Sequence, residues 1–249
     1  MLTIISPAKN QDFTSNIPDR LSVSSPLFSS RTDSLIQICR RFSIEEIKKS
    51  MGLSDRLAEL NFNRYQNFVE QPERPAMFAF NGDVYNNIKR DNFSSTQWQF
   101  LQAHTLIISG LYGALRPLDK IKPHRLEMST KNLSLPTFWQ DTLTNYINQT
   151  LQDHENKCLI NLASNEYFSV INQQNLKYPI INILFKENRN NKLQIIGINA
   201  KKARGSMLNF IAENLVDTKE KLYNFSQLGY QYSTVESSTN NLVFVSNKN

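Results

Sequence analysis

The chain has 249 residues, of which 40% are hydrophobic and 20% charged, a balance typical of globular proteins that excludes a disordered chain. Its 28 Lys and Arg outnumber its 22 Asp and Glu, and the net charge of +6 favours a polyanionic partner or, equally, a plain solvated surface. No apolar stretch approaches the ~20 residues that span a bilayer, and residues 1–5 are too short for a signal-peptide core, so a cytoplasmic protein with no membrane partner is expected.

Short apolar runs, typical of buried strands, recur along the whole chain. They are Leu2–Ile5, Thr105–Ser109, Cys158–Ala163, Pro179–Phe185, Leu193–Ile198 and Leu242–Val245. The polar residues between the fourth and fifth runs predict an antiparallel hairpin. Helical segments alternate with the runs, so the sequence predicts an α/β fold of mixed α+β type. We expect a single domain over residues 1–249, with a mixed central sheet surrounded by helices.

Capping boxes predict the starts of three helices. They pair Ser43 with Glu46 before a helix at Ile44–Met51, Ser94 with Gln97 before a helix through Leu101, and Thr137 with Gln140 before a helix bearing Leu143, Ile147 and Leu151. A further helix is expected from about Ala203 to Leu215, and the Ser-rich stretch Ser22–Ser34 is expected to form a surface loop.

The segment at about residues 43–66 has the pattern of a helix-hairpin-helix. Gly52 ends the first helix, and Ser54 stands at the start of a second one. Such a hairpin binds a DNA phosphate through backbone N–H groups without selecting a sequence. The residues that would contact DNA here are Lys48, Lys49, Gly52, Ser54, Arg56 and Arg64. A helical hairpin that only caps the core is the alternative.

Polar side chains follow several of the predicted strands at the point where each strand ends. Lys9 follows the first strand, Arg116 the second, Glu166 the third, and Lys201, Lys202 and Arg204 the fifth. If these strands are parallel neighbours, their carboxyl ends meet and the side chains line one cleft. Arg116 or Lys201 should then lie within ion-pair reach of Glu127 or Glu166. The alternative for residues 199–205 is the basic start of a surface helix.

Other possible site residues have structural explanations. Asn81-Gly82 predicts a hairpin turn, and a ligand-facing Asp83 is the alternative. His124 is expected to be a structural histidine. Cys39 and Cys158 are expected to be buried, reduced thiols. Neither CxxC nor HExxH is present, so we expect no metal and no cofactor.

Six strings resemble the YaaA family of bacterial peroxide-stress proteins in their order and spacing. They are Ile5–Lys9 (ISPAK), Phe80–Tyr85 (FNGDVY), Ser109–Asp119 (SGLYGALRPLD), Arg125–Met128 (RLEM), Asn161–Phe168 (NLASNEYF) and Ala200–Gly205 (AKKARG). The resemblance covers essentially the whole chain, with Asn81 and His124 as mild departures. It implies a mixed α/β fold with a positively charged cleft and a helix-hairpin-helix that holds double-stranded DNA. It also implies induction by hydrogen peroxide and a lowering of free intracellular iron.

Two functions are therefore expected. The first is a peroxide-stress protein that binds double-stranded DNA independently of sequence and limits free iron and oxidative damage to DNA. Its DNA-binding residues would be Lys9, Lys48, Lys49, Gly52, Ser54, Arg56, Arg116, Lys201, Lys202 and Arg204. The alternative is an enzyme that acts on a phosphorylated or nucleotide-like small anionic ligand in a basic cleft. Its candidate catalytic residues would be Lys9, Asp83, Arg116, Glu127, Glu166 and Lys201.

Overall fold

A mixed nine-stranded sheet forms the centre of the protein, whose computed structural model describes residues 1–18, 21–190 and 192–246. Across the sheet the strands are β11 (Ser226–Gln227), β12 (Tyr230–Tyr232), β13 (Asn241–Ser246), β9 (Ile180–Arg189), β8 (Leu159–Asn161), β1 (Leu2–Ile5), β5 (Thr105–Ser109) and β6 (Gly113–Leu115), with β10 (Lys192–Gln194) paired to β9. The five strands from β13 to β5 are parallel, and the outer pairs are antiparallel. The predicted mixed sheet is confirmed.

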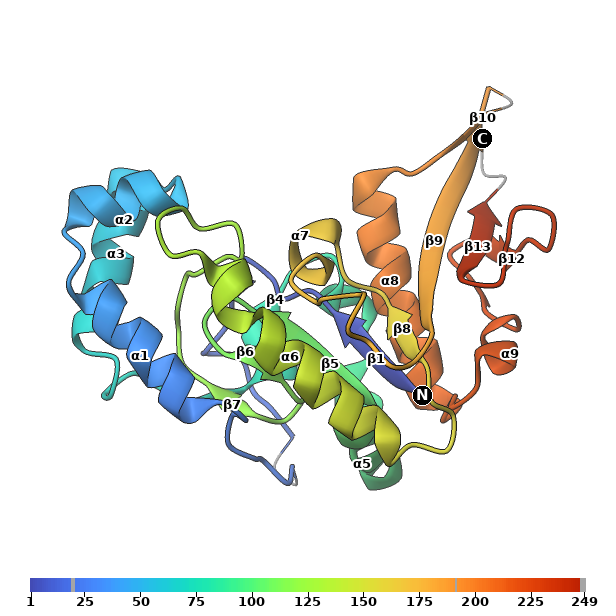
Figure 1. The fold of residues 1–249 in the computed structure, drawn as a ribbon, viewed down its shortest axis with the longest axis horizontal. Helices are drawn as coiled ribbons and strands as arrows, with labels where there is room; N and C mark the ends of the chain where they lie inside the picture. Colours follow the sequence, from blue (N-terminus) through green and yellow to red (C-terminus); the bar gives the residue numbers. More distant parts are fainter. Residues whose placement is uncertain (19–20, 191, 247–249) are drawn as a thin grey trace.

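Helices surround this sheet. They are α1 (Ser29–Arg40), α2 (Ile44–Met51), α3 (Asp55–Gln66), α4 (Ala76–Ala79), α5 (Ser95–His104), α6 (Leu135–Gln152), α7 (Asn165–Phe168), α8 (Gly197–Glu213) and α9 (Lys219–Leu222), with short 3-10 turns η1 (Tyr85–Asn87) and η2 (Arg90–Asn92). Two small antiparallel sheets pair β2 (Asn10–Gln11) with β4 (Phe80–Asn81) and β3 (Arg74–Pro75) with β7 (Lys120–Ile121). In Figure 1 the long helix α6 crosses in front of β1 and β5, and α5 lies behind them.

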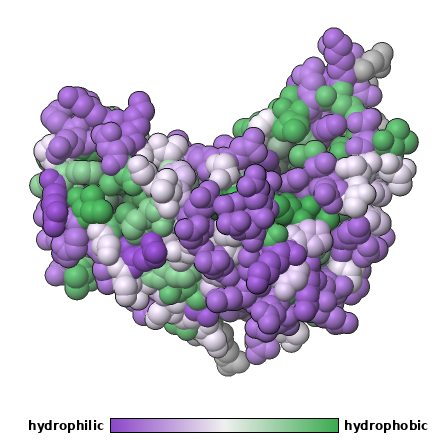
Figure 2. Space-filling view, viewed as in Figure 1, coloured by the Kyte–Doolittle hydropathy of each residue, from purple (hydrophilic) through white to green (hydrophobic). Residues whose placement is uncertain are grey.

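The molecule has two projecting lobes. In Figure 1, α2 and α3 form one lobe at the left, and the far ends of β9 and β10 form the other at the upper right. Figure 2 shows a hollow between the two lobes, and most of the residues along it are hydrophilic. The short helix α7, which follows β8, lies between the lobes in Figure 1. We call the surface between the lobes the concave face.

Most predicted strands are confirmed, but the fifth one is wrong in part. Residues 193–198 were expected to be a strand, whereas β10 ends at Gln194 and α8 already begins at Gly197. The branched residues Ile195 and Ile198 produce a strand-like pattern, yet both are more than half exposed. Residues 199–205 therefore lie in the first half of a helix, which agrees with the alternative of a basic helix start and not with a position directly after a strand.

Three further local predictions are wrong, wholly or in part. Within the predicted loop Ser22–Ser34, α1 begins at Ser29, because Thr32 lies with Leu35 on the helix face that packs into the core. The helix expected after Thr137 begins at Leu135, with Pro136 in the first turn, where proline is well tolerated. Asn81-Gly82 does not close a local hairpin, because Asn81 pairs with Asn10 of β2.

The capping boxes of α2 and α5 are confirmed, with both reciprocal hydrogen bonds present in each. Both cysteines are free thiols; Cys39 is buried as expected, whereas Cys158 is only half-buried. Burial raises the pKa of the Cys39 thiol to about 12, so this thiol stays protonated at neutral pH. It behaves as a small apolar core residue.

Candidate binding cleft at the carboxyl edge of the sheet

A cleft of about 290 Å³ opens where β1 and β8 end. The two strands are parallel neighbours, so the loops that follow them leave the sheet at the same edge. Two hydrogen bonds join these loops: the Ser164 N–H donates to Ser6 Oγ (2.8 Å), and the Ser6 hydroxyl donates to Ser164 Oγ (3.2 Å). The first loop brings Lys9 to the cleft and the second brings Glu166.

The opposite wall of the cleft depends on a close contact at Gly205. A Cβ atom at Gly205 would lie 1.9 Å from the carbonyl oxygen of Val84, so only glycine lets α8 approach this segment so closely. The Tyr85 hydroxyl donates to the Ser6 carbonyl (2.9 Å) and ties the same segment to the loop after β1. As a result Asp83 lines the cleft together with Lys201 and Arg204 of α8.

The cleft holds three cations and two carboxylates. Glu166 accepts hydrogen bonds from the Ser129 hydroxyl (2.7 Å) and the Ser129 N–H (3.2 Å). Among the residues that the structure describes, Lys9, Lys201 and Arg204 have no ion-pair partner. Burial lowers the pKa of the Arg204 guanidinium, because withdrawal from water disfavours its charge. An anion in the cleft would compensate these charges.

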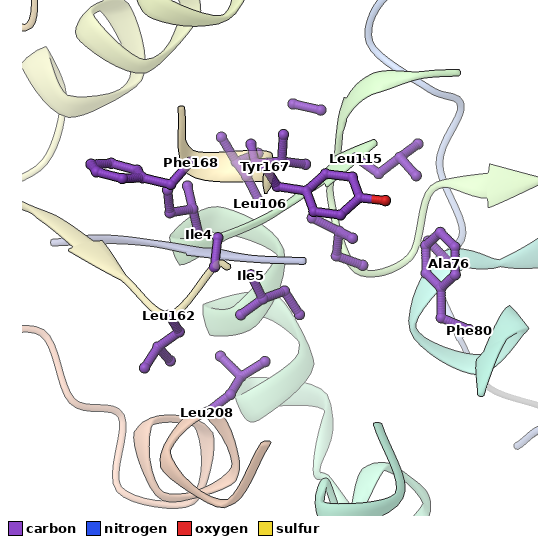
Figure 3. Packing of buried hydrophobic residues seen from close by; sticks show 14 of the residues in the cluster. Ile4, Ile5, Ala76, Phe80, Leu106, Leu115, Leu162, Tyr167, Phe168 and Leu208 are labelled. Carbon is purple, nitrogen blue, oxygen red and sulfur yellow. The ribbon is translucent and has the colours of Figure 1, made fainter. Parts of the chain in front are cut away.

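Beneath the cleft the molecule is packed with apolar side chains. Figure 3 shows Ile5, Leu162 and Leu208 gathered there, below α7. The Tyr167 ring lines the cleft and extends toward Phe80, whereas Phe168 extends to the opposite side of α7. Burial raises the pKa of the Tyr167 phenol well above its usual value, so this phenol is neutral over the physiological range.

Glu127 lies beside the cleft but is already paired. It lines a neighbouring hollow of only about 10 Å³, together with Lys9, His124 and Tyr167. The buried Glu127 carboxylate forms an ion pair with Arg125. His124 is buried and its Nδ1 contacts the Lys122 carbonyl oxygen (2.8 Å), and burial lowers its pKa to about 4. The expectation that His124 is structural is consistent with this neutral, hydrogen-bonded ring.

Arg116 does not join the cleft, contrary to expectation. The turn after β5 leads into β6, which runs back antiparallel along β5 and carries Arg116 away from the carboxyl edge. Arg116 instead donates to the fully buried Asp119 carboxylate (2.8 and 3.1 Å) and to the Ser25 carbonyl (2.9 Å). The expected ion pair of Arg116 or Lys201 with Glu127 or Glu166 is therefore wrong for the described residues.

Lys202 also faces a different site. It lines a separate pocket of about 270 Å³ with Glu187 and Arg189, on another side of α8. Glu187 is buried there and accepts hydrogen bonds from Asn199, Tyr230 and Arg189. A helix spreads consecutive residues by about 100° around its axis. Lys201 and Lys202 therefore line different spaces although they are consecutive.

The predicted helical hairpin is present in α2 and α3. Gly52 ends α2 in the left-handed conformation (φ 61°), as the sequence predicts. Lys48 forms an ion pair with Asp55, the first residue of α3, whereas Lys49 and Arg56 are exposed. Ser54 precedes α3 without a side-chain capping bond. Contact of this hairpin with DNA stays a prediction.

Sequence reasoning missed the residues that shape the cleft: Ser6, Ser164, Tyr85 and Gly205. Ser6 and Ser164 come within three residues of the ends of β1 and β8, and this position could have identified them. In the described residues no group of three or more His, Cys, Asp or Glu could hold a metal ion. The described helices also include none that is long and apolar enough to cross a membrane.

Comparison with known proteins assigns the family. UPF0246 proteins of Rickettsia bellii strain OSU 85-389 and Rickettsia rickettsii strain Iowa are 56% and 51% identical to the chain, over 98% of its length and 100% and 99% of theirs. The UPF0246 protein of Rickettsia felis is 49% identical over 98% of the chain. The family profile described as "Peroxide stress protein YaaA" matches residues 1–236. The chain therefore belongs to the YaaA family of peroxide stress proteins.

Proposed function

We propose that this protein binds double-stranded DNA across its concave face, independently of sequence, and thereby limits oxidative damage to DNA during peroxide stress. The main support is the set of cations in the cleft, Lys9, Lys201 and Arg204, which have no carboxylate partner among the described residues. Lys49 and Arg56 are exposed on the α2–α3 lobe and offer two further cations there. A duplex lying between the lobes would bring its phosphates close to both sets.

The binding would be electrostatic, and its salt dependence tests it. If five cations each neutralise one phosphate, log K should fall with log salt with a slope of about −4 to −5. We expect two unrelated duplexes of equal length to bind with equal affinity in fluorescence anisotropy titrations. A strong preference for one duplex, or an affinity that is insensitive to salt, would refute the proposal.

Single substitutions locate the surface. Lys201→Ala and Lys49→Ala should each weaken duplex binding and reduce the magnitude of the salt slope by about 1. Lys219→Ala on α9, which lies away from the concave face in Figure 1, is the matched control and should change neither. If Lys219→Ala weakens binding as much as Lys201→Ala, the interaction is not confined to this face.

The proposal includes the lowering of free iron, which the family resemblance implies. Fe(II) reduces hydrogen peroxide to hydroxyl radical, so less free iron beside DNA means less damage. Cells that lack the protein should contain more chelatable iron after peroxide treatment, and the wild-type gene should restore the level. Lys201→Ala should fail to protect such cells against peroxide although it folds. Full protection by this variant would separate the cleft from the stress function.

An enzymatic role in the same cleft is the second candidate. The supporting observation is that Asp83 and Glu166 line the cleft beside Lys9 and Lys201. Carboxylates repel phosphate and are not needed to hold DNA, whereas proton transfer uses them. Asp83→Asn should then abolish turnover of a phosphorylated substrate and leave duplex binding intact or tighter. A variant with weaker duplex binding would argue against this second role.

A further inference from the structure

A second and larger chamber, of about 500 Å³, lies on the other side of α7 from the cleft. It exists because β8 ends at Asn161, whereas β9 starts beside β8 and continues to Arg189. Beyond the last pairing of the two strands, Asn161 with Asn182, the edge of β9 on the β8 side has no neighbouring strand among the described residues until Glu187, where β10 pairs with it. The chain after β8 turns into α7 and leaves this space open.

A row of three side-chain amides crosses the sheet at this chamber. Asn161, Asn182 and Asn241 occupy facing positions on the neighbouring strands β8, β9 and β13. Asn161 Nδ2 donates to Asn182 Oδ1 (3.0 Å), and Asn182 Nδ2 donates to Asn241 Oδ1 (3.1 Å). The Ala163 N–H donates to Asn161 Oδ1 (2.9 Å). Because a backbone N–H can donate only to the oxygen, it fixes the direction of the whole row.

The hydrogen bonds described above use only half of the hydrogen-bonding groups of these three amides. Each side-chain amide has two N–H donors and an oxygen with two lone pairs. Asn182 uses one N–H and one lone pair within the row. Asn161 and Asn241 each use one N–H and one lone pair as well, but one of the two bonds of each is made outside the row, with the Ala163 N–H and with Ser238 Oγ respectively. Within the described part of the chain, one donor and one acceptor per residue remain without a partner, which gives an uncharged strip of donors and acceptors. Such a strip matches the edge of a heterocyclic base, which amides recognise by paired hydrogen bonds.

The other walls suit the same kind of group. Phe168 and Leu184 line the chamber and offer apolar surface to the faces of a planar ring. Figure 3 shows Phe168 and Tyr167 extending to opposite sides of α7, toward the chamber and the cleft respectively. Arg204 lines both spaces, so it lies between the cleft and the chamber.

We propose that the cleft and the chamber together bind one nucleoside phosphate unit, with its neutral base along the amide row and its phosphate at Lys9, Lys201 and Arg204. The proposal rests on the role of these cations as a phosphate site, which the proposed function also uses. The unit can come from two sources. It can be a free nucleotide, or a nucleotide of DNA that is unpaired and turned out of the duplex.

The first test uses the wild-type protein and free ligands. Isothermal titration with deoxynucleoside 5′-monophosphates should give affinities at least about tenfold higher than with inorganic phosphate or with the matching deoxynucleoside, because each lacks one of the two contact sets. Equal affinity for nucleotide and inorganic phosphate would overturn the proposed chamber. This comparison needs no variant, so it does not depend on the folding of a mutant.

The second test removes the centre of the row. Asn182→Leu should weaken nucleotide binding about tenfold and leave inorganic phosphate binding unchanged. Asn188→Leu is the matched control, because residues 182 and 188 lie on the same face of β9 but Asn188 does not line the chamber. Thermal unfolding shows whether both variants are folded. Wild-type nucleotide affinity in a folded Asn182→Leu variant would refute the role of the row.

The source of the unit is decided by two duplexes of equal length, one fully paired and one with a single extrahelical base. If the unit belongs to DNA, the second duplex should bind more tightly, and Asn182→Leu should abolish only that increment. If the unit is free, the two duplexes should bind equally while mononucleotides still bind. If the proposed function is wrong, the result is different: the wild-type protein binds neither duplex but still binds nucleotides.

Discussion

Replacement of Gly205 by alanine tests how the cleft is assembled. The new methyl carbon would lie 1.9 Å from the Val84 carbonyl oxygen, 2.8 Å from the Val84 carbonyl carbon and 3.1 Å from Asn87 Cβ. Two of these atoms belong to the backbone, so no side-chain rotation can relieve the contact. Residues 83–87 would have to move away from α8.

The size of the effect follows from two opposing terms. Overpacking of a close contact costs about 1–3 kcal/mol, and a backbone clash this severe belongs at the upper end. Alanine in a helix interior recovers about 1 kcal/mol relative to glycine. The net loss of unfolding free energy should be about 2 kcal/mol, and the unfolding midpoint should fall by about 4–8 °C for a chain of this size.

A matched control is available in the same helix. Gly197 is the first residue of α8, and no atom lies within 4 Å of the position that its Cβ would occupy. Gly197→Ala should therefore leave stability unchanged or slightly raised. Thermal and urea unfolding of the two variants, with duplex titrations at a temperature where both are folded, measure the difference. Equal stability of the two variants would refute the close contact as the device that positions Asp83 beside Lys201.

Three further predictions concern other parts of the molecule. Gly52→Val should lower the unfolding free energy in urea titrations by about 1–2 kcal/mol, because the backbone at this residue has the left-handed conformation. Gly52→Asn should cost less, since asparagine tolerates that conformation better. An equal cost of the two substitutions would contradict this reason. Between pH 6.5 and about 4 the unfolded chain protonates His124 while the folded chain keeps it neutral, because burial lowers its pKa to about 4. Acidification through this window should therefore remove up to about 3 kcal/mol of unfolding free energy. Urea titrations at several pH values should show that His124→Gln lacks this part of the pH dependence. Asp119→Ala should lower the unfolding free energy by about 3–5 kcal/mol, because it leaves the Arg116 guanidinium without its buried partner. It should not weaken duplex binding by the folded protein. A loss of affinity would indicate that Arg116 belongs to the DNA-binding surface.

The sequence predicts the elements whose signals are local. The apolar runs at β1, β5 and β13 and the capping boxes of α2 and α5 need only neighbouring residues, and all are confirmed. Strands of two residues, such as β2 and β4, have no pattern of their own. They form because residues 10–11 and 80–81 meet in space.

The cleft was predicted only in part, because only some of its residues follow from local sequence signals. Lys9 and Glu166 follow parallel strands that are direct neighbours, so the rule for carboxyl ends applies to them. Arg116 fails because the chain reverses into β6 before it, a turn that depends on the left-handed Gly113 packed against the Trp139 ring. Lys201 reaches the cleft from a helix and not from a strand, through the contact of Gly205 with Val84. Neither contact can be read from the residues that flank these positions.

The order of strands in the central sheet has a consequence for biosynthesis. β1 is made first, but its partners are distant: Thr3 pairs with Thr105 on one side and with Ile160 on the other. A nascent chain therefore carries an apolar strand with both edges unpaired until β5 has left the ribosome, and with one edge unpaired until about residue 160 has done so. β13 completes the parallel part only at the end. Such non-local pairing slows folding and exposes strand edges that favour aggregation. Synthesis of this protein during oxidative stress would place that vulnerable interval where chaperones are most in demand.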